Sequence, residues 1–208
     1  MRIIHYFKNK KPVIFFVIYL RYLIGGAMVF SSIVKIKGER FTSADGATAP
    51  IKSAWHLFET LYQSGLYWKF LGWSQLLAGL LLMTQLYATL GAVIMLPITI
   101  NIVVITLSYS FGGTPVITVL LLLANIFLVL WEYDKLLPLF RVSSRQQEKA
   151  LLPTTAVEAA RIWNYLGVLL FLFTVVYVPL FERNPIPWFL ICIILGLGGL
   201  IIFHRLNK

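Results

Sequence analysis

The residues of this chain that could do chemistry are amides and charges placed inside apolar segments. Arg21 and Gln75 lie in the first two long apolar runs, Asn101 lies in the third, and Asn125 and Glu132 lie in the fourth. Because a polar group that faces lipid is energetically costly, such groups turn inward and find partners. We therefore expect a polar interior formed by Gln75, Asn101 and Asn125. Arg21 should lie below it, within reach of either Glu132 or Asn125.

Helical spacing supports this expectation, because the unusual residues of each run recur every three or four positions and so share one face. The four stripes are Arg21, Gly25, Met28, Ser32 and Lys35; Trp68, Gly72, Gln75, Gly79 and Leu82; Pro97, Asn101 and Ser108; and Thr118, Asn125 and Glu132. Four such stripes predict four helices that face a shared centre.

Two functions fit a polar centre of this kind. Amides from separate helices commonly bond one another and hold a membrane bundle together. They can equally contact a ligand, such as a quinone headgroup, which needs hydrogen-bond donors at two carbonyls and an apolar slot. The candidate ligand-binding residues are Arg21, Trp68, Gln75, Asn101, Asn125 and Glu132. The residues alone leave both readings open.

Familiar catalytic machinery is absent from the sequence. It has no HExxH motif, P-loop or nucleophile elbow. Its three histidines, His5, His56 and His204, lie far apart, and Cys192 is its single cysteine. We therefore predict no catalytic residue, no metal site and no cofactor held by the chain itself. A redox role would need a diffusible carrier such as a quinone, or a partner subunit.

The composition is that of a membrane protein. Apolar residues make up 59% of the 208 and charged residues 12%, against about 25% charged in soluble domains. Runs long enough to cross a bilayer need about 20 apolar residues. The six candidate spans are Val13–Ile36, Leu66–Tyr87, Ala88–Leu107, Thr114–Tyr133, Ile162–Phe181 and Ile186–Phe203. The sequence predicts an all-α, polytopic membrane protein with a tight hairpin between its second and third spans.

Basic residues indicate how these spans are oriented. More of the 18 Lys and Arg residues lie at the two termini and in the segment 134–161 than in the remaining loops. By the positive-inside rule, this bias places both termini in the cytoplasm. The charges also lie at helix ends, where they contact lipid headgroups rather than nucleic acid. We expect membrane lipids as partners and no nucleic acid.

The first outer loop, Lys37–Gly65, is expected to end in a short helix capped by Ser53. Aromatic and polar side chains fall on different faces of this helix, as in helices that lie in the membrane interface. The two faces are Trp55, Phe58 and Tyr62, and His56, Glu59 and Gln63. We expect a lid on the outer end of the bundle. The alternative is that His56 and Glu59 line an entrance to the interior.

A polar segment, Asp134–Arg161, separates the first four spans from the last two. It divides the chain into a four-helix transmembrane core (1–140), a cytoplasmic linker (141–161) and a C-terminal hairpin of two transmembrane helices (162–208). The hairpin is a candidate docking element for a partner protein.

Parts of the sequence resemble DoxX-like membrane proteins. The segment 20–35, LRYLIGGAMVFSSIVK, is similar to the family's opening helix, and 67–79, YWKFLGWSQLLAG, to its second. Leu90-Gly91 followed by 97–101, PITIN, looks like its third. The resemblance covers about residues 14–140. Gln75 departs from the pattern, because the family often has an acid at that position, and this departure argues against a proton-transfer role there.

The resemblance implies a four-helix core in a bacterial inner membrane, with both ends of that core cytoplasmic. The family takes its name from a subunit of a thiosulfate:quinone oxidoreductase. It therefore implies an accessory subunit of a membrane redox complex, with other membrane or periplasmic subunits as partners and a quinone as ligand.

Residues and resemblance together predict a membrane protein that holds a quinone-like or lipid-like molecule in its polar interior. One alternative is a structural anchor for partner proteins, whose buried amides are only glue. A small-molecule transporter is a further alternative, although the sequence shows no inverted repeat.

Overall fold

The computed structural model describes residues 8, 10–42, 45–109, 111–140, 157, 161–181 and 184–206, with the side chains of 137–140 excepted. Over these residues the regular elements are helices. They are α2 (Lys11–Ile36), α3 (Ala54–Gln63), α4 (Leu66–Met83), α5 (Ala88–Ser108), α6 (Thr114–Trp131), α7 (Tyr133–Phe140), α8 (Arg161–Leu180) and α9 (Pro185–Leu206). The linker predicted at 141–161 falls almost wholly outside the described residues.

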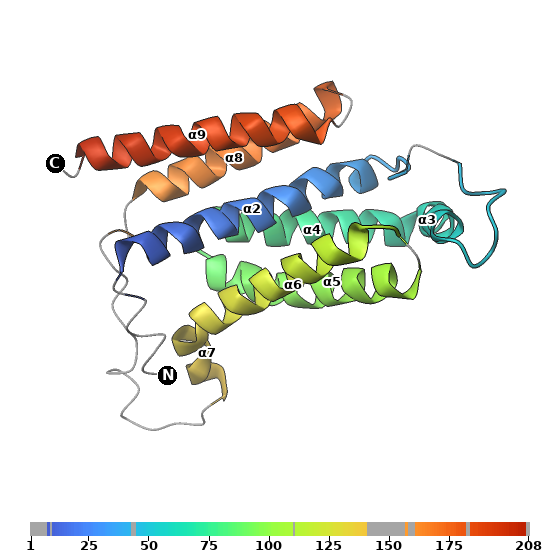
Figure 1. The fold of residues 1–208 in the computed structure, drawn as a ribbon, viewed down its shortest axis with the longest axis horizontal. Helices are drawn as coiled ribbons and strands as arrows, with labels where there is room; N and C mark the ends of the chain where they lie inside the picture. Colours follow the sequence, from blue (N-terminus) through green and yellow to red (C-terminus); the bar gives the residue numbers. More distant parts are fainter. Residues whose placement is uncertain are drawn as a thin grey trace.

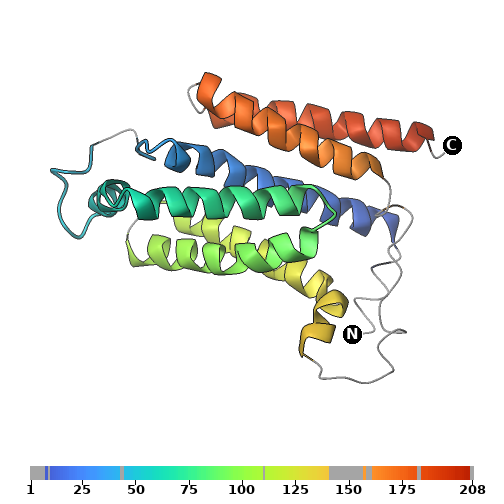
Figure 2. The same cartoon turned by 180° about the vertical axis from the view of Figure 1, so that it is seen from behind.

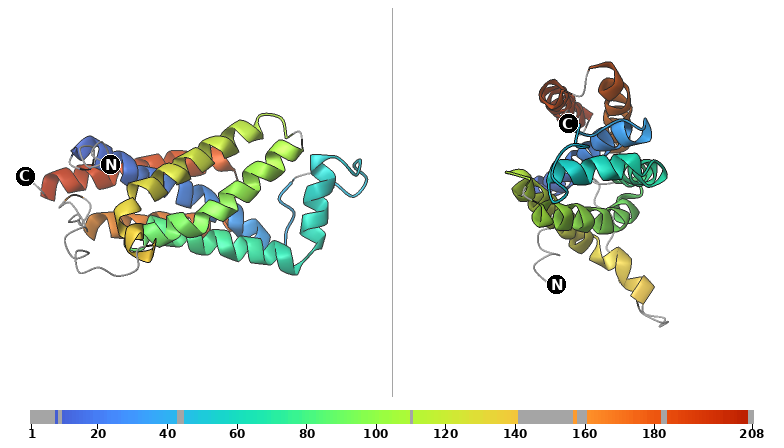
Figure 3. Two further views of the ribbon diagram at one scale, coloured as in Figure 1. Left: turned by 90° about the horizontal axis from the view of Figure 1, so that it is seen from below. Right: turned by 90° about the vertical axis from the view of Figure 1, so that its right-hand side faces the viewer.

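The long helices stack in three layers of two (Figures 1 and 3). Helices α2 and α4 form the middle layer and pack most extensively against each other. Helices α5 and α6 cover one side of this layer, and α8 and α9 cover the other. Successive long helices run in opposite directions, so the bundle has two ends. We call the end where α2 begins the Lys11 end and the opposite one the α3 end.

Glycines allow the two middle helices to approach closely. A Cβ atom added to Gly25 would lie 2.9 Å from the carbonyl oxygen of Gly79, and one added to Gly79 would lie 2.8 Å from that of Gly25. A Cβ on Gly72 would come within 2.9 Å of the Lys35 side chain. Small residues at helix contacts let backbones pack tightly where lipid offers no hydrophobic driving force. The stripe of Gly72 and Gly79 is thus a packing surface.

Five of the described helices are long and apolar enough to cross a membrane: α2, α5, α6, α8 and α9. Helix α4 is not among these five, because Lys69, Ser74 and Gln75 dilute its apolar character. It nevertheless lies alongside α2 and α5 in the bundle (Figure 2). The fold is therefore all-helical, with the make-up of a polytopic membrane protein.

Two local predictions are confirmed. The hairpin between the second and third predicted spans is a turn between α4 and α5, in which Gln85 adopts a φ of 61°. The short helix of the first outer loop is α3, and its N-cap Ser53 accepts a hydrogen bond from the backbone N–H of His56 at 3.2 Å. Helix α3 lies across the end of the bundle, roughly perpendicular to the long helices (Figure 3, left).

Candidate functional site

A buried ion pair joins α2 to α6 at the Lys11 end. Arg21 and Glu132 are each 3% exposed, and an Arg21 Nη2 hydrogen donates to Glu132 Oε1. Arg21 Nη1 also donates to Gln85 Oε1 at 2.8 Å, in the α4–α5 turn. Thr89 on α5 donates to Glu132 Oε2 at 3.0 Å, and the Lys135 ammonium lies 2.7 Å from the same oxygen. The predicted pairing of Arg21 with Glu132 is confirmed.

A further ion pair lies at the same end. Lys8 lies 2.7 Å from a carboxylate oxygen of Asp134 and 5.8 Å from the ring centroid of Trp131. Polar groups from α2, the α4–α5 turn, α5 and α6 thus bond one another. This charge cluster links the middle layer to the α5–α6 layer. Its bonds fix the two layers to each other, and we call it a clamp in that sense.

Gln75 and Asn125 are buried, as predicted, but each bonds a different neighbour. Gln75 on α4 accepts from Ser31 Oγ at 3.4 Å on α2. Asn125 on α6 donates to Thr99 Oγ1 at 3.3 Å on α5. With its amide reversed, Asn125 bonds the α5 backbone instead. Both amides act between adjacent helices, and the structure does not bring them together in one shared centre.

The prediction that Asn101 turns inward is wrong. Asn101 is exposed on the outer face of α5, together with Pro97 and Ser108 from its predicted stripe. Thr99, which is 1% exposed, takes the inward position and contacts Asn125. Asn101 lies two positions after Thr99, about 200° around the helix, so both cannot face the same neighbour.

Sequence reasoning also missed a second polar stripe on α5. Thr99 and Thr106 are seven residues apart, so they share a face, and both are buried. The Thr106 hydroxyl lies 2.8 Å from that of Thr118 on α6. The seven-residue spacing of two threonines was the available signal.

The cavity that the structure shows lies on the opposite side of the middle layer. It has a volume of about 310 Å³ and is bounded by α2, α8 and α9, with Met83 of α4 completing the wall. Its wall includes Phe16, Leu23 and Leu197, which are 57%, 46% and 54% exposed. The cavity therefore reaches the side of the bundle, where a bilayer would surround a membrane protein. Ligand sites usually measure about 300–1,000 Å³, so this one suits a small molecule or part of a longer one.

The hydroxyl and indole groups in the cavity wall are already bonded within the protein. Tyr19 Oη donates to the carbonyl of Gly196 at 2.6 Å. Trp188 Nε1 donates to Thr174 Oγ1 at 3.0 Å, and that hydroxyl donates to the Leu170 carbonyl at 2.8 Å. What remains is apolar surface, contributed mostly by α2, α8 and α9. None of Arg21, Trp68, Gln75, Asn101, Asn125 and Glu132 lines it.

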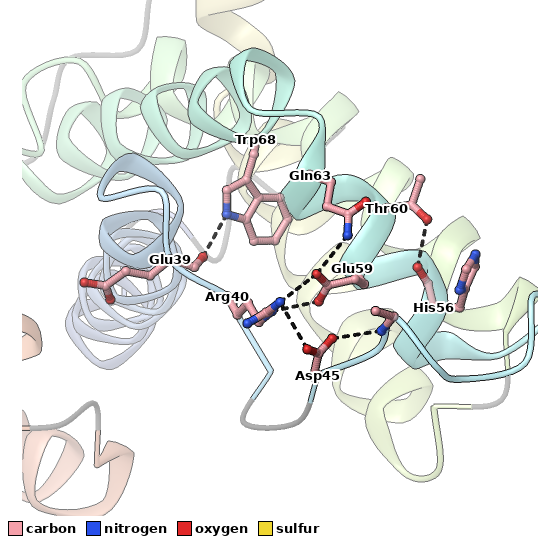
Figure 4. A network of polar contacts seen from close by, with 9 residues as sticks. Glu39, Arg40, Asp45, His56, Glu59, Thr60, Gln63 and Trp68 are labelled. Carbon is pink, nitrogen blue, oxygen red and sulfur yellow. Dashed lines mark hydrogen bonds and ion pairs between the residues drawn. The ribbon is translucent and has the colours of Figure 1, made fainter.

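At the α3 end, a second polar network fixes the loop to α3 (Figure 4). Arg40 donates from Nε and Nη2 to the two Glu59 oxygens at 2.8 and 2.9 Å, and Gln63 donates to Glu59 at 3.1 Å. Arg40 also lies 3.4 Å from Asp45. The bidentate guanidinium holds the pKa of the Glu59 carboxyl below its usual range. The Glu59 carboxylate thus has a structural role. We call its pair with Arg40, which fixes the loop to α3, the latch.

The other predicted residues near this end are separated from one another. Trp68 is buried under the loop, and its Nε1 donates to the Glu39 carbonyl at 3.0 Å. The His56 imidazole points away from Arg40 and Glu59 (Figure 4), and its Nδ1 has no hydrogen-bond partner among the described residues. The structure does not join His56 and Glu59 in a common entrance.

Chemistry at a metal is not indicated by the described part of the chain, where no three His, Cys, Asp or Glu side chains gather as metal ligands would. The described part of the chain thus combines five helices that are long and apolar enough to cross a membrane, internal polar contacts between helices, and a lateral apolar cavity.

Comparison with known proteins adds a relative to this description. The chain is 36% identical over 100 residues to the uncharacterized protein YwoB of Bacillus subtilis (strain 168). The match covers 46% of this chain and 62% of that protein. No family model matches the chain, and no solved structure matches it. The resemblance to DoxX-like proteins therefore stays a prediction.

Proposed function

We propose that this chain is a polytopic membrane protein that holds the apolar part of a lipid-like molecule in the cavity between α2, α8 and α9. The observation that carries the proposal is the cavity's composition and position. Its wall is apolar, and its polar groups are satisfied by one another. It reaches the lateral surface, from which a molecule dissolved in the bilayer would enter.

The apolar wall of the cavity suits the hydrocarbon tail of a lipid-like molecule better than its polar headgroup. A quinone carbonyl or a phosphate needs hydrogen-bond donors, and the candidate donors Arg21, Gln75 and Asn125 bond elsewhere in the protein. An acyl or isoprenoid chain needs only apolar surface, whose burial is worth about 25 cal/mol per Å². A quinone therefore remains a candidate ligand through its isoprenoid tail.

The membrane topology is part of the same proposal. Helix α4 crosses the bilayer with the five more apolar helices, because it lies between α2 and α5, and its buried Gln75 bonds α2 instead of facing lipid. The bias of Lys and Arg then places the Lys11 end in the cytoplasm of a bacterial inner membrane. In keeping with the DoxX-like resemblance, we assign the chain an accessory role beside other membrane or periplasmic subunits.

The test uses two adjacent isoleucines on α9. Ile193 lines the cavity, whereas Ile194 does not and is 66% exposed. Ile193→Trp fills the cavity, and Ile194→Trp adds the same bulk to the outer surface. The full-length proteins are purified in mild detergent, and bound small molecules are quantified by mass spectrometry.

Wild type and Ile194→Trp should carry one hydrophobic molecule per chain, and Ile193→Trp should lose most of it. Equal retention by the two variants would place the molecule elsewhere and refute the proposal. A wild type that carries nothing would favour the second candidate, a structural anchor. That candidate draws support from the amides of Gln75 and Asn125, which bond neighbouring helices as glue does.

A further inference from the structure

The outer face of α5 carries a polar group that lipid cannot satisfy. Asn101 is exposed, and its side chain makes no hydrogen bond within the part of the chain that the structure describes. At 1.5 Å per residue it lies about 20 Å from Ala88 and about 10 Å from Ser108 along the helix. The amide therefore falls within the apolar length of α5 and not at its end.

The residues around Asn101 form a face suited to helix packing. Pro97, Asn101, Val104 and Ser108 follow one another at spacings of four, three and four, and all are exposed. This is the repeat of a helix–helix seam. Pro97 has no N–H, so the carbonyl of Val93 on the same side of α5 lacks its usual helical donor. We call these four residues the α5 seam.

We propose that the α5 seam is the interface between two copies of this chain, with the two Asn101 amides paired across a twofold axis. The inference rests on the proposed membrane topology but not on the cavity, which lies on the opposite side of the middle layer. It accounts for a side-chain amide that α5 turns outward within its apolar length.

The chemistry of the Asn101 amide favours a second copy of this chain as the partner at the α5 seam. An amide has two donor hydrogens and an acceptor oxygen, so two of them can donate to each other reciprocally. Two copies inserted in the same orientation present Asn101 at the same depth, so a twofold axis along the membrane normal brings the amides together. A twofold interface uses the same patch on both subunits. A different partner would need its own polar group at this depth, whereas a second copy supplies it automatically.

Association is measured on the full-length protein, labelled with donor and acceptor dyes in phosphatidylcholine vesicles at decreasing protein-to-lipid ratios. Interhelical hydrogen bonds in membranes are modest, so Asn101→Leu should weaken association by about tenfold. Asn101→Gln keeps the amide and should retain most of it. Leu123→Ala, at an exposed position on α6, is the matched control and should change nothing.

Cross-linking locates the interface independently. In a Cys192→Ser background, Val104→Cys should form a disulfide-linked dimer in the native membrane, and Leu123→Cys should not. A chain that is monomeric at every dilution would overturn the proposal, as would an Asn101→Leu variant that associates like wild type. A Val104→Cys product linked to a different membrane protein would overturn it as well, because it would assign the seam to another partner.

Discussion

Glu132→Gln tests whether the charge cluster at the Lys11 end is a clamp. The substitution keeps the size and one acceptor oxygen of the side chain but removes its charge. Arg21, which is 3% exposed, then remains buried without a carboxylate. Breaking a buried ion pair by removing one partner costs about 3–5 kcal/mol. Because each 1.4 kcal/mol is about tenfold in an equilibrium constant, the folded-to-unfolded ratio should fall by more than about a hundredfold.

The double variant Arg21→Met/Glu132→Gln distinguishes the cost of an unpaired buried charge from the cost of altering these two positions. It removes both charges, so the cost of an uncompensated buried ion disappears. Replacing a buried pair by apolar groups is often neutral, and we expect the double variant to lie within about 2 kcal/mol of wild type. It should thus be more stable than Glu132→Gln alone. The free energy of unfolding is measured by reversible denaturation in mixed micelles, followed by circular dichroism.

Asp134→Asn is the matched control at the same end. Its pair with Lys8 keeps some contact with water, with the two side chains 14% and 17% exposed, so its loss should cost about 1 kcal/mol or less. The reasoning fails if Glu132→Gln is as mild as Asp134→Asn, or if the double variant is less stable than the single one.

Two further predictions concern α8 and α3. Gly167→Ala should destabilise the protein by more than about 2 kcal/mol, because the added Cβ would overlap the Met83 carbonyl. The added Cβ of Gly198→Ala meets no atom within 4 Å, so this control should be neutral or stabilising. The unfolding midpoints of the two variants are compared, and equal midpoints would contradict the close contact of α8 with α4. Arg40 depresses the pKa of Glu59 in the folded protein, so the Arg40–Glu59 pair stabilises α3 above the ordinary carboxyl pKa of about 4.3. This stabilisation is lost as the pH falls through and below that value. Amide hydrogen exchange in α3, corrected for intrinsic rates, should therefore accelerate at low pH in wild type, and an identical pH profile in Glu59→Gln would refute the role of the pair.

Local rules predicted the parts of the fold that depend on neighbouring residues in the sequence. Ser53 caps α3 because the cap involves only the next helical turn. Gly72 and Gly79 recur at a helical spacing, which predicted that they share one face of α4; the structure shows that α2 packs on that face. The pair of Arg21 and Glu132 was predictable because a deep charge has few alternatives to an opposite charge at its own depth.

Features that depend on how helices rotate and stack were not predictable. Helix α5 is apolar on most sides and has polar residues on two faces, one with Thr99 and one with Asn101. Either face could have turned inward, and the choice depends on the contacts offered by α6. The cavity was missed for a related reason, since its lining residues come from separate helices that are far apart in the sequence and share no spacing. Nothing in the types or spacing of these residues indicated that the helices would leave a cavity between them.

The central place of α2 has a consequence for biogenesis. This helix is the first of the long helices to leave the ribosome, yet one of its contacts is with the last: Tyr19 bonds the carbonyl of Gly196 on α9. Tyr22 likewise donates to the carbonyl of Trp163 on α8. In the proposed membrane topology, the two phenol groups of the nascent chain lack these acceptors until the late segments are synthesised. A ribosome stalled before residue 196 would leave an incomplete intermediate that insertion factors must shelter or membrane proteases remove.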